Sequence, residues 1–296
     1  MRSSEPNARS NSAATGGADP LRPSEILVRA AAYLERHGVE SPRESAEALM
    51  MMVLSTDRAG LYSRREGLSS VEARMFGRAL CQRCVGTPLQ HLTGQQAFRR
   101  ISVAVRPGVF IPRPETEVLV DVALEWLDAA ENPVVVDVGT GTGAVALAIA
   151  DERRGVRVFA TDLSPEAVEL AQENAARLGL SVTVLQGDLL EPLPRELRGA
   201  LDLVVSNPPY VTDAEYEGLP AEVRADPRMA LVGGTRLHER LAAEAIGWLR
   251  RGGALAVEIG ASQRPDVAKV LEGSYQDVRT VADLAGRDRI VVGRRP

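Results

Sequence analysis

Two short segments of this sequence combine side chains that ordinary scaffolding does not require. The first, SNPPYV (206–211), follows the apolar run LDLVV and places an amide, two prolines and a tyrosine at the end of an expected buried strand. The second, GTGTG (139–143), follows the apolar run VVVDV. A rigid turn needs neither an asparagine before its two prolines nor a tyrosine after them, so the first segment indicates chemistry.

The glycine-rich segment has the composition of a turn that a ligand can approach closely. Glycines let the backbone turn sharply, and ligands of parallel sheets bind beyond the carboxyl ends of the strands. Gly139, Gly141 and Ala144 also fit G-x-G-x-x-A, so a dinucleotide, another nucleotide-like cofactor and a merely structural turn all remain open. Asp137, inside the preceding strand, is expected to orient the loop. The candidate cofactor-binding residues of the turn are Gly139, Thr140, Gly141, Thr142 and Gly143.

Acidic residues follow the next two expected strands. Asp162, in FATDLSP, is suited to the two hydroxyls of a ribose; its alternative role is to cap the next helix. Ser164 and Pro165 already supply an N-cap and a first helical residue, which frees Asp162 for a ligand. In LQGDLL, Asp188 can accept from an adenine amino group while Leu189 flanks the ring, although an ordinary loop aspartate would look the same.

Strands and helices must alternate to bring these segments together. After an expected helix at 115–130, apolar or alternating runs predict seven strands separated by helical patterns. This alternation indicates an α/β fold with a mostly parallel sheet covered by helices on both faces. The expected strands are 134–138, 156–161, 182–186, 201–206, 254–259, 278–281 and 290–292.

The N-terminal part of the chain has a different character. Residues 1–22 are rich in Ser, Asn, Gly and Ala and predict a disordered tail. Residues 23–86 predict a small helical domain with no catalytic constellation: Ser24 caps a first helix, Ser41 with Pro42 begins a second, and a third spans about 69–85. Residues 87–112 alternate around RPG and predict a hairpin linker, which leaves 113–296 for the sheet domain.

Bulk composition excludes several classes of protein. The 296 residues are 45% hydrophobic and 25% charged, as in a soluble globular protein, and no apolar window suits a membrane span. A net charge of −5 means that the chain as a whole lacks the positive charge typical of proteins that bind nucleic acid. Cys81 and Cys84 lack further suitably spaced ligands, so we expect no metal site and read them as reduced thiols of a cytoplasmic protein.

Taken together, the glycine-rich turn, the two acids and NPPY resemble the class I S-adenosylmethionine-dependent methyltransferases, in the branch that methylates planar amino or amide nitrogens. PLQHLTGQQAF (88–98), VFIPRPETE (109–117), EVRADPRMALVGG (222–234) and DLAGRDRIVV (283–292) further resemble the peptide chain release factor N5-glutamine methyltransferases. The resemblance implies a Rossmann-like seven-stranded sheet and S-adenosylmethionine as the cofactor. It also implies a helical domain that recognises the substrate, and methylation of the glutamine in the Gly-Gly-Gln motif of release factors.

The same resemblance implies what NPPY does. An amide nitrogen is a poor nucleophile, and it must be aimed at the methyl group with the reacting atoms about 3–3.5 Å apart. The side-chain oxygen of Asn207 and the carbonyl of Pro208 can accept its two N–H bonds, and Tyr210 can pack on the amide plane. Asn207, Pro208 and Tyr210 are therefore the candidate catalytic residues. Pro209 stiffens the loop and shares in substrate binding.

VFIPRPETE is a further candidate region. By resemblance, Phe110 and Arg113 border the methionine end of the cofactor and the substrate channel. The alternative is a proline-stiffened linker capped by Thr116 before the next helix. Glu258, at the end of the fifth expected strand, is a weaker candidate.

Four other functions compete with this hypothesis. A ribosomal-protein glutamine methyltransferase and a nucleic-acid amino methyltransferase share NPPY; the acidic charge disfavours a direct nucleic-acid substrate. A dinucleotide-dependent oxidoreductase leaves NPPY unexplained, and a silent binding module leaves both segments without a role.

Overall fold

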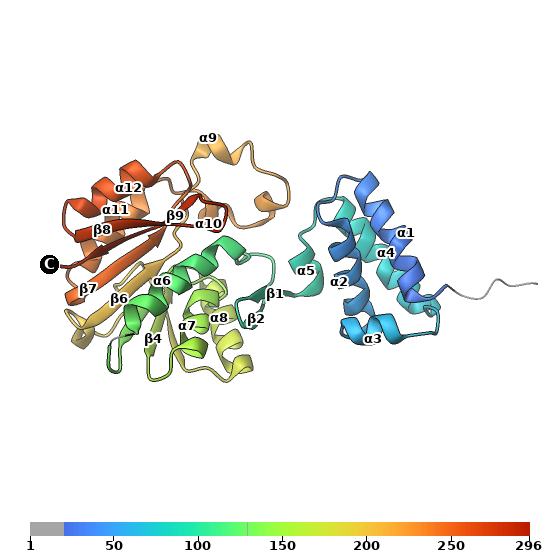
Figure 1. Ribbon diagram of the computed structural model, residues 1–296, viewed down its shortest axis with the longest axis horizontal. Coiled ribbons are helices and arrows are strands. Elements are labelled where there is room, and N and C mark those ends of the chain that lie inside the picture. The colour runs from blue at the N-terminus through green and yellow to red at the C-terminus, as the bar shows by residue number, and fades with distance from the viewer. Residues whose placement is uncertain (1–20, 129) are drawn as a thin grey trace, which may run out of the picture. The chain divides into compact units, whose positions relative to one another are not determined.

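The computed structural model of the chain describes residues 21–128 and 130–296 (Figure 1). The chain divides into two compact units, of which the first ends at Cys84 and the second begins at Val85. The tail predicted at 1–22 lies outside the described residues except for its last two. Domain limits at 23–86, 87–112 and 113–296 stay a prediction. Across the described ranges, no helix combines the length and the apolar content that crossing a membrane requires.

Helices alone form the described part of the first unit. Amphipathic spacing brings Leu27, Ala30 and Leu34 of the first helix into a core with Leu49 and Met50 of the second. The helices are α1 (Pro23–Arg36), α2 (Pro42–Leu54), α3 (Arg58–Ser63) and α4 (Ser70–Cys84).

The second helix begins where expected, with Ser41 before Pro42, whereas the start of the first helix and the capping bond of Ser41 differ from the prediction. Helix α1 begins at Pro23 rather than after Ser24, because proline suits the first helical position and Glu25 accepts from the backbone N–H of Arg22 at 2.8 Å. Ser41 precedes α2 in a left-handed conformation (φ 47°) and its side chain makes no capping bond. A serine cap needs an extended backbone, which this φ does not provide.

The second unit begins with α5 (Leu89–Thr93), which a β-hairpin follows. Strands β1 (Gln95–Phe98) and β2 (Ile101–Ala104) pair through Phe98 and Ile101. The hairpin therefore turns at 99–100 and not at RPG, which forms a separate turn after β2. Arg99 adopts φ 50° there, and its guanidinium is held 2.6 Å from both Asp121 and Glu152. The local pattern that suggested a turn at RPG contains no information about these long-range ion pairs.

The seven expected strands form one sheet in the order β5-β4-β3-β6-β7-β9-β8, which confirms the predicted fold. The first five in this order are parallel, whereas β9 runs antiparallel to both of its neighbours. The strands are β3 (Val134–Val138), β4 (Arg157–Asp162), β5 (Val182–Gln186), β6 (Leu201–Ser206), β7 (Leu249–Glu258), β8 (Gln276–Ala282) and β9 (Asp288–Arg294).

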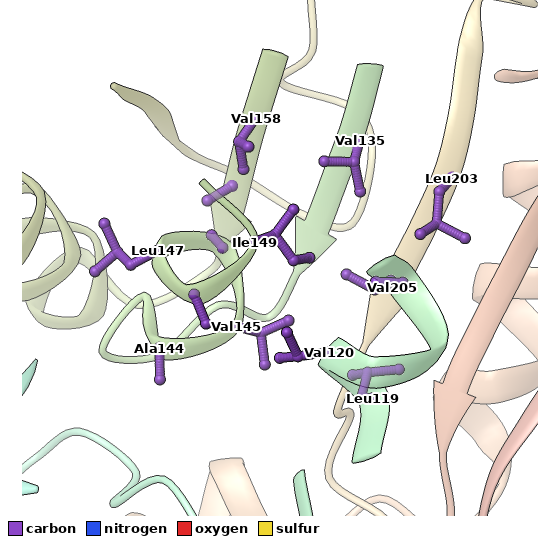
Figure 2. Close-up of a cluster of buried hydrophobic side chains, with 14 of the residues drawn as sticks. Leu119, Val120, Val135, Ala144, Val145, Leu147, Ile149, Val158, Leu203 and Val205 are labelled. Atoms are coloured by element: carbon purple, nitrogen blue, oxygen red, sulfur yellow. The ribbon is translucent and has the colours of Figure 1, made fainter. Parts of the chain in front are cut away.

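Helices cover both faces of this sheet (Figure 1). Successive valines of β3 point to opposite faces, as the two-residue period of a strand requires. Val135 joins α6 (Glu117–Leu127), α7 (Ala144–Glu152) and α8 (Pro165–Leu178) in one core, part of which Figure 2 shows. Val134 and Val136 join α11 (Arg236–Ala245) and α12 (Arg264–Glu272) in the other.

Short helical segments complete the second unit. They are η1 (Pro114–Thr116), η2 (Arg195–Leu197), α9 (Asp213–Tyr216), η3 (Val223–Ala225) and α10 (Arg228–Leu231).

Candidate active site

A cavity of about 460 Å³ lies at the carboxyl ends of β3, β4, β5 and β6. Strand β3 lies between β4 and β6, so the cavity is at the point where the strand order reverses, which is where parallel sheets bind ligands. Apart from the weaker candidate Glu258, its lining includes all but one of the predicted site residues: Phe110, Arg113, Gly139, Thr140, Gly141, Thr142, Asp162, Asp188, Leu189, Asn207, Pro208, Pro209 and Tyr210.

Gly143 is the exception, since it is absent from the cavity lining. A Cβ at Gly143 would lie 3.1 Å from Leu147 and 3.2 Å from Ala171, and the residue adopts φ 83° where α7 begins. Gly143 therefore serves the close packing of α7 on α8. The prediction that it contacts the cofactor has no geometric support.

The glycine-rich turn leaves room for a ligand to approach its backbone. Gly139 (φ 72°) and Gly141 (φ 57°) have no atom within 4 Å of where a Cβ would stand. Asp137 lies buried beneath them and accepts from the Thr140 hydroxyl at 2.6 Å and the Ala146 amide at 3.2 Å. Burial raises the pKa of Asp137 to about 7. Its partners agree with the expectation that Asp137 orients the loop.

Asp162 connects two of the loops that line the cavity. Its carboxylate accepts from the backbone N–H of Gly141 at 2.8 Å and of Ser164 at 2.9 Å, while burial raises its pKa. Ser164 caps α8 by accepting from the Ala167 amide, as the sequence predicted. Each carboxylate oxygen has two lone pairs, so Asp162 can still accept from hydroxyl groups of a ligand.

Asp188 has a partner that the sequence did not reveal. Arg240 of α11 donates to its carboxylate at 2.6 Å, and both side chains are partly exposed at the cavity. Leu189 adopts φ 47°, and its carbonyl accepts from the Thr161 hydroxyl at 2.8 Å. These two contacts fix the orientation of the segment that follows β5.

Two side-chain hydrogen bonds, one from Ser206 and one from Asn207, hold the start of NPPY in place. Ser206 donates to the carbonyl of Val138 at 2.7 Å, which attaches the end of β6 to β3. Asn207 donates through Nδ2 to the hydroxyl of Thr116 at 3.0 Å. This bond leaves the side-chain oxygen of Asn207 for another donor. Thr116 precedes α6 but its side chain makes no capping bond there, so the alternative that it caps this helix is wrong.

Pro209 and Tyr210 are held by residues that follow in the sequence. A Cβ on Gly233 would stand 2.2 Å from the Pro209 carbonyl oxygen, so the two backbones touch. Gln263 donates to the Tyr210 carbonyl at 2.7 Å. The Tyr210 hydroxyl lies 3.5 Å from Oε1 of Glu258.

Phe110 and Arg113 join the segment before α6 to the segment before α10. The Arg113 guanidinium lies 5.2 Å from the centre of the Phe110 ring and forms an ion pair with Asp226. Asp226 also accepts from the Ile111 amide at 3.1 Å. Burial raises the pKa of Asp226 to about 6, and Arg113 opposes that shift.

Sequence reasoning missed Arg240, Gly233, Gln263 and Asp226, and it misjudged Thr116. Each contacts a predicted residue more than 20 positions away, from Gly233 against Pro209 to Asp226 against Arg113. No local pattern marks such pairs. Only the occurrence of Asp226 and Gly233 within EVRADPRMALVGG, which carried part of the resemblance, offered a signal.

Within the described part of the chain, the lining of the cavity contains no cysteine or histidine. Cys81 and Cys84 are free on α4. Over the described ranges of the chain, no three His, Cys, Asp or Glu residues gather in a way that could hold a metal ion.

Comparisons with known proteins agree with this geometry. Residues 25–94 match the PrmC N-terminal domain, and residues 100–223 match the methyltransferase small domain. Release factor glutamine methyltransferases from Moorella thermoacetica and Mycolicibacterium smegmatis are 45% and 44% identical to the chain. The alignments cover 92% and 90% of this chain and 98% and 95% of those proteins.

A solved structure supports the fold independently. A 16S rRNA methyltransferase from T. thermophilus in complex with AdoMet and guanosine has a TM-score of 0.51 at 20% identity, over 68% of this chain and 50% of that one. The cavity also suits S-adenosylmethionine: its volume lies within the range of about 300–1,000 Å³ of cofactor sites, and it offers open glycine backbone and a buried acid. The chain therefore belongs to the release factor glutamine methyltransferase family and is an S-adenosylmethionine-dependent methyltransferase.

Proposed function

We propose that the chain transfers a methyl group to the side-chain nitrogen (N5) of the glutamine in the Gly-Gly-Gln motif of peptide chain release factors. The names of its relatives support the substrate class. One observation carries the reaction: Nδ2 of Asn207 is engaged by Thr116, which leaves an oxygen acceptor at the cavity beside the glycine-rich turn. We expect the reaction to occur in the cytoplasm, where release factors act.

On the cofactor side, we assign each residue to one chemical group of S-adenosylmethionine. Asp162 accepts from the ribose hydroxyls, Asp188 accepts from the adenine amino group, and Leu189 packs on the ring. The backbone of Gly139 and Gly141 admits the cofactor closely. When bound, S-adenosylmethionine supplies a methyl group on a positively charged sulfur.

On the acceptor side, the chain orients the nitrogen. The oxygen of Asn207 and the carbonyl of Pro208 accept its two N–H bonds and stabilise positive charge that develops on it. Tyr210 packs on the amide plane and excludes water. No side chain needs to act as a strong base, because an N-methylated amide that still carries its proton is acidic enough to lose it to water.

The rest of the cavity suits an aliphatic side chain that carries one polar group. Apolar residues of the loops around α9, η3 and α10 line the cavity beside NPPY: Leu219, Val223, Met229 and Leu231. Phe110 and Arg113 would border the same channel. We assign recognition of the rest of the factor to the N-terminal helical domain, 23–86.

The test is methyl transfer from radiolabelled S-adenosylmethionine to a panel of acceptors. Purified release factor, its Gly-Gly-Gln variant with alanine in place of glutamine, tRNA, ribosomal RNA, DNA and ribosomal protein are each incubated with the enzyme. We expect label on the factor alone, and none on the alanine variant. Label on nucleic acid or ribosomal protein, with none on the factor, would refute the proposal.

A further inference from the structure

Tyr210 must keep one orientation if its ring is to cover the acceptor amide. The proposed reaction, on which this inference rests, uses that ring as a flat surface beside Asn207. A tyrosine side chain has two rotatable bonds that adopt few preferred angles, so the position of the ring follows from the backbone that carries it. Contacts that fix the Tyr210 backbone therefore also place its ring.

The segment that follows β7 lies beside Tyr210. Strands β6 and β7 are parallel neighbours, and Ser206 pairs with Val257 near their carboxyl ends. Both segments therefore leave the sheet at the same edge. A Cβ on Gly260 would stand 3.4 Å from Cδ2 of Tyr210, so the edge of the ring lies next to the Gly260 backbone. Residues 258–263 thus support the ring on one side.

Gln263 joins this segment to the backbone of Tyr210. Its Nε2 donates to the Tyr210 carbonyl at 2.7 Å, and its Oε1 accepts from the Gly260 N–H at 3.0 Å. A carbonyl only accepts and an N–H only donates, so a half-turn of the Gln263 amide would oppose both partners. The amide therefore has one orientation, in which it holds Tyr210 against the end of β7.

The side chain of Gln263 does not serve the helix that it precedes. Gln263 occupies the N-cap position of α12, where short polar side chains usually accept from the backbone of the first turn. Gln263 makes no such capping bond. Its amide is directed to Tyr210 and Gly260 instead. The start of α12 therefore gives no reason for the contacts that this side chain makes.

The hydroxyl end of Tyr210 is held less firmly than its backbone. The hydroxyl lies 3.5 Å from Oε1 of Glu258, which is at the outer limit for a hydrogen bond. The next residue, Val211, donates its N–H to the Leu231 carbonyl at 2.8 Å. The backbone at this end of NPPY is therefore held by two short hydrogen bonds, of which Gln263 supplies the one from a side chain.

We propose that Gln263 is a positioning residue: by joining the Tyr210 carbonyl to the Gly260 N–H, it fixes the Tyr210 ring over the acceptor amide. Gln263 is absent from the lining of the cavity, so it acts through Tyr210 and not by contact with a substrate. It supports the rate by keeping the acceptor nitrogen aimed. Cofactor affinity does not depend on it, because the glycine-rich turn follows a different strand.

An isosteric change tests the hydrogen bond itself. Gln263→Glu keeps the shape and the acceptor for Gly260, but at pH 8 its carboxylate only accepts and therefore repels the Tyr210 carbonyl. We expect kcat to fall about 10-fold or more in the cofactor-saturated enzyme, since a misplacement of about 1 Å can cost on the order of 100-fold. The dissociation constant for S-adenosylmethionine should change less than about twofold. Wild-type kcat, or an equal loss of cofactor affinity, would overturn the proposal.

A lower pH should partly restore this variant. A glutamate carboxyl ordinarily titrates at about pH 4.3, so roughly a sixth of it is protonated at pH 5 and can again donate to the Tyr210 carbonyl. The kcat of Gln263→Glu, relative to wild type at the same pH, should therefore rise at least about twofold between pH 8 and pH 5. Gln263→Met lacks both the donor and the charge, and its relative kcat should be reduced equally at both pH values. A constant ratio for Gln263→Glu would overturn the proposal.

Gln172→Glu is the matched control. Gln172 of α8 also donates through Nε2 to a backbone carbonyl, that of Val184 at 3.3 Å, and it is absent from the cavity lining. The same substitution there should leave kcat within about twofold of wild type at each pH. A loss and recovery of equal size in Gln172→Glu would show a general effect of the added charge and would overturn the proposal.

A readout that needs no acceptor separates this inference from the assigned substrate. In enzyme labelled with ¹³C-tyrosine and saturated with S-adenosylmethionine, the ring resonance of Tyr210 is the one that Tyr210→Phe lacks. In Gln263→Glu this resonance should shift at pH 8 and return toward its wild-type position at pH 5. A failure of the wild-type enzyme to label release factors would refute the substrate alone, whereas an unshifted Tyr210 resonance would refute the positioning role.

Discussion

Replacement of Gly233 by alanine tests whether the rigid placement of NPPY sets the rate. The added Cβ would stand 2.2 Å from the Pro209 carbonyl oxygen and 3.1 Å from its carbonyl carbon. Both are backbone atoms, so no side-chain rotation can relieve the contact. Gly233 is also held at 3.0 Å by a hydrogen bond from its N–H to the Val211 carbonyl, which limits its own retreat.

The size of the displacement follows from these distances. Real Cβ atoms essentially never approach another heavy atom closer than 3.0 Å, so the two segments must separate by about 0.8 Å. A misplacement of about 1 Å at reacting groups can cost on the order of 100-fold in rate. Overpacking of this kind destabilises the fold by about 1–3 kcal/mol. We therefore expect kcat to fall by about 10- to 100-fold in a protein that still folds.

The assay is single-turnover methyl transfer at saturating S-adenosylmethionine, with cofactor affinity measured by calorimetry. The glycine-rich turn is a separate segment, so the cofactor dissociation constant should stay within about threefold. Gly234→Ala is the matched control: no atom lies within 4 Å of its Cβ position, and at φ 56° it costs only about 1–2 kcal/mol of backbone strain. If Gly233→Ala and Gly234→Ala transferred methyl groups at the same rate, the steric reasoning would be refuted.

Three further predictions concern single side chains. Asn207→Ala should keep cofactor affinity and lose most transfer, and wild-type transfer by this variant would exclude the amide clamp. Asp162→Asn places an NH₂ group against one of two backbone N–H donors, so calorimetry should show S-adenosylmethionine bound about 10-fold or more weakly. Arg64 lowers the pKa of Glu72 from 4.5 to about 2, so its ionised form stabilises the fold above pH 4.5 and this effect is lost as pH falls toward 2. Glu72→Gln should lower the melting temperature at pH 7, and the difference from wild type should shrink at pH 4.

Much of the fold could be read from local patterns. The apolar runs at 134–138 and 201–206 coincide with β3 and β6, because a strand buried on both faces is a mostly apolar segment. The alternating run at 182–186 coincides with the edge strand β5, which is only partly buried. Strand β7 instead begins at Leu249, five residues before the expected start, since its first residues include exposed arginines that no apolar pattern contains. The hairpin was misplaced because the local pattern around RPG reveals neither the left-handed backbone at Arg99 nor its ion pairs with Asp121 and Glu152.

Sequence alone also determined the chemistry of the site. The glycine-rich turn, Asp162 and NPPY each follow an expected strand, and parallel strands bring their carboxyl ends to one edge of the sheet. Their residue types, together with the resemblance they carry, identified the class of reaction. Gly143 was assigned to the cofactor because the pattern cannot distinguish a glycine that faces a ligand from one that permits helix packing.

Only the tertiary structure decided which residues hold those groups in place. Thr116 lies 91 positions from Asn207, Gln263 lies 53 from Tyr210, and both pairs are in hydrogen-bond contact. Such contacts depend on the order of strands in the sheet and on the loops that cross its edge. A local pattern reflects the period of one element and the chemistry of one turn. It contains no record of which distant donor or acceptor the folded chain brings to within 3 Å.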